Sequence, residues 1–352
     1  MAYTTIDDPS AHFTTTLYTG NGSDDRSITN SANAGDFKPD WLWIKERDQT
    51  RGHALQDSNR GATKYLGSHT NSAENTNANG VQAFETNGFQ LGTDTDINLN
   101  TGTYVAWQWK ANGGTTTSGG SDDTVSTSAH QANTTAGFSV VTYSGTGTQG
   151  HTVAHGLGVA PEVIFLKARN KSQNWRVFHH KTASDGTKRL ILDQTNAQED
   201  AAFLNDTTPS STVFTLGASD DAWNASDGTY VAYCFAPIQG YSKFGTYTGN
   251  GNADGVFVYT GFKPAWLMVK NTESARNWML FDNKRGAINV IDEILEANTS
   301  DAERDGDKVD FLSNGFKMRD NGSENNSSEK FIYLAFAEHP FVSSKGVPVT
   351  AR

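Results

Sequence analysis

One strand-like stretch occurs three times in this chain, as FKPDWLWIKERD from Phe37, VAPEVIFLKARN from Val159 and FKPAWLMVKNTE from Phe262. In each copy a proline precedes a run in which both alternating faces are apolar. Such a run is typical of a strand that is covered on each side. The proline lies at the strand entrance, where its missing N–H donor costs little. We therefore expect each copy to form the central strand of a β-sandwich.

Further landmarks recur in the same order around each copy. A Tyr-containing strand runs into a glycine turn at LYTGNGS, TYSGTGT and TYTGNGN, and each unit closes with TYVAWQW, TYVAYCF or FIYLAFA. We expect the closing strand beside the proline-led strand. Asn21-Gly22 and Asn250-Gly251 predict hairpins with a type I′ turn, which needs positive φ at both central residues.

The repeats predict three domains, because units of about 100 residues can bury a core, whereas solenoid units are several times shorter. We predict an all-β chain of three tandem β-sandwiches, each with room for one short helix. The helical pattern is clearest from Arg285, where Ile288, Ile291 and Leu295 fall at helical spacing. The predicted boundaries are 1–112 for the first repeat, 113–136 for a flexible Gly/Ser/Thr-rich linker, 137–239 for the second repeat, and 240–352 for the third repeat with a C-terminal tail.

Composition narrows the possible classes of protein. Lys plus Arg number 28 against 39 Asp plus Glu, a formal charge of −11, which argues against nucleic-acid binding. Cys234 is the single cysteine, so an intrachain disulfide and a cysteine-rich zinc site are excluded. No stretch approaches the roughly 20 apolar residues of a membrane helix, and no cleavable signal precedes the first repeat. We expect a soluble protein that does not insert into membranes.

One charged motif recurs in two of the three copies. Asp57, Arg60 and Gly61 reappear as Asp282, Arg285 and Gly286, whereas His179 replaces the aspartate in the middle copy and no Arg-Gly follows. A carboxylate and a guanidinium this close can grip a ligand. Most such pairs fix a loop instead, and exposed ones contribute about 0–1 kcal/mol. We interpret the motif as structural.

The remaining chemistry-bearing patterns favour no catalytic site. Gly145, Gly147 and Gly150 match G-x-G-x-x-G but stand where the other copies have a turn, and His151 and His155 flank a glycine-rich turn rather than lying on a helix. The acidic loops 219–228 and 301–310 can supply oxygen ligands for calcium, but neither follows the EF-hand register, so solvated turns are the default. We predict no enzyme activity, no bound metal and no cofactor, with a weak calcium site as the alternative.

Seven tryptophans lie in strand-like runs and are expected in cores, whereas Trp223 lies in a polar, acidic loop. An exposed ring there can stack on a sugar or fill a pocket of a partner protein. The alternative is a contact that pins the loop. Trp223 is the single candidate for a ligand-binding residue.

The chain resembles tandem-repeat proteins encoded among the virion structural genes of tailed, mainly marine, bacteriophages. MAYTTIDDPSAHFTTTLYTGNGS, FKPDWLWIKERD, HALQDSNRGATKYL, ETNGFQLGT and GTYVAWQWKANGG carry the resemblance, which is close in the first copy, recognisable in the third and weaker in the middle one. Such proteins are described as tail-fibre-like or lectin-like. The resemblance implies lectin-like or jelly-roll-like sandwiches on the surface of a virion, made in the host cytoplasm.

We therefore expect a non-enzymatic, tail-fibre-like virion protein that binds a host surface glycan or protein. Its other partners are expected to be virion proteins of the tail or capsid, and it is expected as a homo-oligomer or in many copies per particle. A capsid decoration or cement protein is the alternative, and a polysaccharide depolymerase is the third hypothesis.

Overall fold

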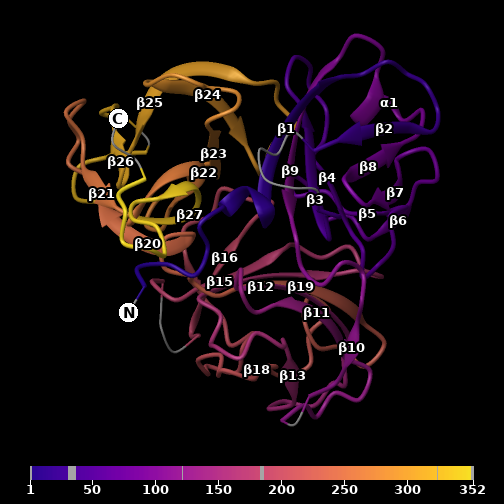
Figure 1. Cartoon of the computed structure of the whole chain (residues 1–352). Coiled ribbons are helices and arrows are strands. Elements are labelled where there is room, and N and C mark those ends of the chain that lie inside the picture. The colour runs from indigo at the N-terminus through magenta and orange to yellow at the C-terminus, as the bar shows by residue number, and fades with distance from the viewer. Residues whose placement is uncertain (1, 31–36, 121, 183–185, 323, 350–352) are drawn as a thin grey trace.

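The computed structural model describes residues 2–30, 37–120, 122–182, 186–322 and 324–349. Over these residues the chain is all-β, as predicted, with a 3₁₀ helix η1 (Pro9–Ala11) and a short helix α1 (Thr95–Asn98) as its helices. The strands form three lobes around a common centre (Figure 1). We call the segments that carry β1 to β9, β10 to β19 and β20 to β27 the first, second and third repeats.

The first repeat contains three sheets, with strand orders β1-β9-β3-β4, β2-β8-β7 and β5-β6. Its strands are β1 (Phe13–Thr19), β2 (Arg26–Thr29), β3 (Trp41–Glu46), β4 (Ala54–Asp57), β5 (Lys64–Tyr65), β6 (Asn75–Thr76), β7 (Val81–Glu85), β8 (Gly88–Leu91) and β9 (Thr103–Trp109).

The second repeat has one long sheet, β10-β11-β12-β19-β14-β15-β16-β17, and the pair β13-β18. Its strands are β10 (Thr117–Ser118), β11 (Ala129–Asn133), β12 (Phe138–Ser144), β13 (Thr152–Ala154), β14 (Val163–Ala168), β15 (Arg176–His179), β16 (Lys188–Ile191), β17 (Glu199–Asp200), β18 (Val213–Thr215) and β19 (Thr229–Phe235).

The third repeat is a single eight-stranded sheet, β20-β27-β22-β23-β24-β25-β26-β21, which curls into a nearly closed barrel. Its strands are β20 (Ser242–Thr248), β21 (Phe257–Tyr259), β22 (Phe262–Asn271), β23 (Met279–Asp282), β24 (Ile291–Glu296), β25 (Arg304–Leu312), β26 (Gly315–Met318) and β27 (Lys330–Pro340).

The strand that the sequence repeats has a neighbour on each side in all three sheets, which confirms its predicted central place; a β-sandwich in each repeat stays a prediction. β3 lies between β9 and β4, β14 between β19 and β15, and β22 between β27 and β23. The closing strand is its neighbour each time, with Trp43 opposite Trp107, Phe165 opposite Tyr233 and Met268 opposite Leu334.

The two apolar faces of this strand enter two different cores. In β3, Leu42 and Ile44 pack within the first repeat, whereas Trp41 and Trp43 point into a core that all three repeats share. The same alternation holds in the other repeats, where the residues facing the shared core are Val163, Phe165, Trp266 and Met268. Each repeat therefore encloses its own core on one side only, and the second side is covered by the other two repeats.

Aromatic side chains join the repeats inside this shared core. Trp41 stacks on Tyr233 of the second repeat, with ring centroids 4.4 Å apart. Trp109 lies 5.7 Å from the Phe336 ring of the third repeat, and Phe336 lies 5.9 Å from Phe235. All three pairs of repeats thus contact one another, so the repeats close into a ring.

The helix predicted from Arg285 is wrong. β24 and β25 occupy this segment, Ile291 and Leu295 are buried, and Ile288 is 82% exposed. The spacing of three apolar residues misled the prediction, because β-branched residues and pairing of β24 with β23 and β25 favour a strand here. Helix α1 lies elsewhere, before β9 in the first repeat.

The predicted Asn-Gly hairpins are also wrong. β1 pairs with β9 and β2 with β8, so the turn at Asn21-Gly22 carries the chain from one sheet to another. Only the glycine of each Asn-Gly pair has positive φ, 68° at Gly22 and 64° at Gly251, so neither pair forms a type I′ turn.

The predicted flexible linker, residues 113–136, is partly built into the second repeat. β10 and β11 lie within it, and β11 pairs with β12 from Ala129 opposite Thr142 to Asn133 opposite Phe138. A polar Gly/Ser/Thr composition is compatible with a strand when a neighbouring strand supplies the pairing. The domain boundaries remain a prediction. Among the described residues, no helix has the length and apolar character to cross a membrane.

Candidate functional site: the junctions between repeats

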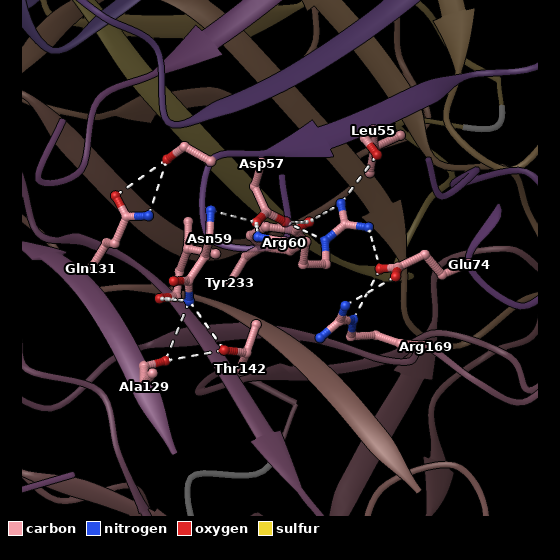
Figure 2. A network of polar contacts seen from close by, with 12 residues as sticks. Leu55, Asp57, Asn59, Arg60, Glu74, Ala129, Gln131, Thr142, Arg169 and Tyr233 are labelled. Atoms are coloured by element: carbon pink, nitrogen blue, oxygen red, sulfur yellow. Dashed lines mark hydrogen bonds and ion pairs between the residues drawn. The ribbon is translucent and has the colours of Figure 1, made fainter. Parts of the chain in front are cut away.

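The recurrent Asp-Arg motif lies where repeats meet. The side chains of Arg60 and Asp57 are completely buried, and Arg60 Nε donates to Asp57 Oδ2 at 2.5 Å (Figure 2). Tyr233, which comes from β19 of the second repeat, donates its hydroxyl to the same carboxylate at 2.7 Å. Arg60 Nη2 donates to that hydroxyl oxygen at 3.1 Å and to Leu55 O at 3.2 Å. The pair therefore binds a partner in the next repeat.

Glu74 extends this network across the junction. It accepts from Arg60 Nη1 at 2.9 Å and, through both carboxylate oxygens, from Arg169 of the second repeat at 2.9 Å (Figure 2). Its backbone N–H also donates to Arg169 O at 2.6 Å. Burial alone would raise the pKa of the Glu74 carboxyl, but the hydrogen bonds and charges of Arg169 and Arg60 hold that pKa below its ordinary value.

An equivalent network joins the third repeat to the first. Arg285 Nε donates to Asp282 Oδ2 at 2.6 Å, and Trp107 of the first repeat donates its indole N–H to the same oxygen at 3.0 Å. Trp107 occupies the position in β9 that Tyr233 occupies in β19. Glu303 binds both Arg285, at 2.8 Å, and Arg47 of the first repeat, at 2.6 Å.

The junction between the second and third repeats differs. His179 stands in place of the aspartate, and Leu334 stands at the position of Tyr233 and Trp107, so the charged pair and its cross-repeat partner are missing together. His179 Nε2 instead lies 3.3 Å from Tyr333 O in the third repeat. The backbone contact is kept, because Gln198 N donates to Thr272 O at 2.9 Å as Glu74 N donates to Arg169 O.

A third set of contacts follows the same cyclic order. Trp175 of the second repeat donates to Gly67 O of the first at 2.8 Å, and Trp278 of the third donates to Ile191 O of the second at 2.9 Å. His53 of the first repeat donates from Nε2 to Glu296 O of the third at 3.0 Å. These three residues begin or precede equivalent strands, so the repeats are related by a pseudo-threefold axis.

The two glycines of the motif have different roles. Gly61 has φ of +104°, a conformation that side chains rarely adopt, and nothing lies within 4 Å of a Cβ placed there. Gly286 lacks positive φ, but a Cβ would meet Glu293 Oε2 at 2.7 Å. The Asp and Arg side chains of the motif are buried and the arginine donors are engaged, so the chemistry of the motif is that of holding two repeats together.

Trp223 is half-buried against the core of the second repeat. Its indole N–H donates to Ala218 O in the same loop at 2.9 Å, and the guanidinium carbons of Arg176 and Arg189 lie 5.9 and 5.8 Å from its ring. These contacts fix the Trp223 side chain within its own loop and against the core of the second repeat. A ligand-binding role for Trp223 stays a prediction.

The acidic loops hold lysine and arginine side chains. Lys171 Nζ contacts both Asp221 and Asp227, at 2.6 and 2.5 Å, and Glu303 is the junction residue described above. Among the residues that the structure describes, no three His, Cys, Asp or Glu side chains gather in a way that could hold a metal ion.

Sequence reasoning missed three buried asparagines. Asn98, Asn224 and Asn325 are fully buried, and the side-chain amide of each donates to two backbone carbonyls of its own repeat. One of these carbonyls lies in the Gly-rich turn after β1, β12 or β20, so each asparagine fixes the turn that follows this strand. The signal was present in the sequence, because each asparagine stands at the same offset before the closing strand.

Comparison with known proteins places the whole ring in one family. No curated protein matches the chain significantly. One family model, described as a domain of unknown function, matches residues 8–340 and so covers all three repeats. The chain therefore belongs to the family of the domain of unknown function DUF7483.

Proposed function

We propose that the chain is a non-enzymatic surface protein of a tailed-phage virion, which binds a host surface glycan or protein through loops on three lectin-like repeats. The resemblance carried by MAYTTIDDPSAHFTTTLYTGNGS and FKPDWLWIKERD supports the virion assignment. The single structural observation that supports an attachment role is the closed ring, in which large aromatic residues and buried ion pairs lie inward.

A closed ring of this kind can present surface loops to a host cell. Sheet faces and buried charges hold the repeats together, so the loops at the outer ends of the lobes are free to vary without disturbing the junctions (Figure 1). Three similar units on one rigid platform can engage one surface at several points, and such multivalency raises avidity without requiring any strong single site. The formal charge of −11 keeps such a platform soluble.

The pseudo-threefold axis favours a second candidate, a capsid decoration or cement protein. Three similar repeats around one axis present three similar surfaces, so a single chain can match a local threefold position of a capsid lattice. In that role the ring would contact virion proteins over equivalent faces of its repeats, in many copies per particle.

Binding, imaging, adsorption and sugar-release measurements separate these candidates. Purified, fluorescently labelled protein should bind host cells and compete with phage adsorption, and a matched preparation inactivated by heat serves as the control. Cryo-electron microscopy of the particle should place the chain on tail appendages. Normal adsorption of particles that lack the protein would refute attachment, copies spread over the head would favour decoration, and release of reducing sugars from host envelope would indicate a depolymerase.

A further inference from the structure

Two of the three junctions contain a buried histidine that contacts the third repeat. His53 of the first repeat accepts the indole N–H of Trp43 at Nδ1 (2.7 Å) and donates from Nε2 to Glu296 O (3.0 Å). His179 of the second repeat accepts Lys181 N–H at Nδ1 (3.1 Å) and donates from Nε2 to Tyr333 O (3.3 Å). Because an indole or backbone N–H only donates and a carbonyl only accepts, both rings are fixed as neutral imidazoles protonated at Nε2.

Protonation of either ring at Nδ1 opposes the fold. It would break the bond from Trp43 or Lys181 and would place a positive charge in a fully buried site. Burial, the charges of Lys45, His69 and Arg285, and a counteracting bond to Glu296 O set the pKa of His53 well below its ordinary value. Burial, with His180 and Lys181 nearby, lowers the pKa of His179 to about 3.

Among the residues that the structure describes, no carboxylate forms an ion pair with His179. Glu162 Oε2 lies 3.2 Å from His180 Nε2, and Lys181 and Lys243 are the cations that face Glu162. His180 donates to Phe244 O and is partly exposed, so its protonated form can keep Glu162 as a partner. The acid-sensitive group at this junction is therefore His179.

The junction between the first and second repeats lacks such a group among the described residues. Trp175 takes the place of His53 there, and Asp57 takes the place of His179. His12, which contacts Asn133 across this junction, is partly exposed. We propose that mild acid loosens both junctions of the third repeat, so that this repeat separates from the ring while the first and second repeats stay joined.

The size of the effect follows from proton linkage. A histidine that must stay neutral in the closed ring, but has an ordinary pKa near 6.5 once exposed, shifts the equilibrium toward opening by about tenfold for each pH unit below 6.5. The two histidines together give about a hundredfold per pH unit. The shift continues until the pH reaches the folded pKa, which for His179 is about 3.

Hydrogen exchange of the full chain between pH 7 and 4.5, corrected for intrinsic exchange rates, tests this inference. We expect β22, β23 and β27 to lose protection steeply below pH 6.5, while β12, β14 and β19 lose it later. His53→Gln with His179→Gln should remove most of this pH dependence, because the glutamine amide supplies the same donor and acceptor without charge. His155→Gln is the matched control, since His155 is equally fixed, between Leu157 N and Ser210 O, but within the second repeat.

Equal loss of protection in all three repeats of the native chain would overturn the proposal, as would an unchanged pH slope in the double variant. If the double variant does not fold, each single variant should halve the slope of the third repeat, and a slope that neither variant alters would overturn it equally.

Discussion

Replacing Arg60 by methionine should destabilise the ring by about 3 kcal/mol. Removing one member of a buried ion pair costs about 3–5 kcal/mol, because the remaining charge stays buried. Asp57 would keep the Tyr233 hydroxyl and two backbone N–H donors, those of Asn59 and Arg60, which places the expected loss at the lower end of that range. Glu74 would keep Arg169.

Lys188→Met in the same chain is the control. Lys188 pairs with Asp200, whose side chain is 87% exposed, and such pairs contribute at most about 1 kcal/mol. Urea unfolding followed by tryptophan fluorescence at pH 7 measures both variants, and a common m-value shows that the midpoint reports stability.

A double variant tests the physical reason. Asp57→Asn with Arg60→Met removes the orphaned charge, while the amide oxygen can still accept from the backbone N–H groups of residues 59 and 60, so it should be more stable than Arg60→Met alone by about 1 kcal/mol or more. The reasoning is refuted if Arg60→Met costs no more than Lys188→Met, or if the double variant is less stable than the single one.

Three further predictions follow from the cores and the buried polar groups. The isolated second repeat, residues 113–239 with β10 and β11 included, should aggregate or melt without cooperativity, because Trp175, Tyr233 and Phe235 would face water, whereas the full chain should unfold in one transition; calorimetry of both distinguishes these outcomes. Asn224→Ala should cost about 1–3 kcal/mol, because the buried carbonyl of Gly217 and the partly buried carbonyl of Thr148 lose their donor, against less than about 0.5 kcal/mol for the exposed Asn196→Ala, as measured by urea unfolding. Burial lowers the pKa of Lys270 to about 7, so the folded chain carries the full penalty of a buried charge below pH 7. As pH rises from 7 toward 10.5 the folded state loses this proton before the unfolded state does, so the free energy of unfolding should increase by up to about 1.4 kcal/mol per pH unit. Lys270→Met should remove this increase, as measured by urea unfolding between pH 7 and 9.

The central strand and its neighbour were predictable because their determinants are local. A proline at the entrance and apolar residues on both faces indicate a strand covered on each side, and the closing segment, TYVAWQW in the first repeat, recurs with the length and apolar pattern to pair along it. What covers the second face was not predictable. Trp41 and Trp43 indicate burial, but the sequence pattern does not distinguish a second sheet of the same repeat from the faces of two other repeats.

The junction was visible in the sequence as a recurring motif but not as a contact. Asp57 and Arg60 lie three residues apart, whereas Tyr233 is 176 residues from Asp57 along the chain. A comparison of the three copies held the missing information, since the copy with His179 meets the closing strand that has Leu334, and the copies with aspartate meet Tyr233 and Trp107. The helix predicted around Ile288 failed for a different reason. Three apolar residues at helical spacing are weak evidence for a helix, and the pairing of β24 with β23 and β25 outweighs them.

In the middle copy, the replacement of the Asp-Arg pair therefore represents a different junction chemistry and not the loss of a junction. All three junctions keep the same backbone contact, from Glu74 to Arg169, from Gln198 to Thr272 and from Glu303 to Arg47. Since the backbone and the shared core already fix the register, the charged networks are free to differ between junctions. Two junctions use a buried pair that requires a hydroxyl or indole partner, and the third uses a neutral imidazole that requires only a carbonyl. A ring built from one repeated unit thereby acquires a second junction with a buried neutral imidazole, His179, beside the one that contains His53, and both contact the third repeat.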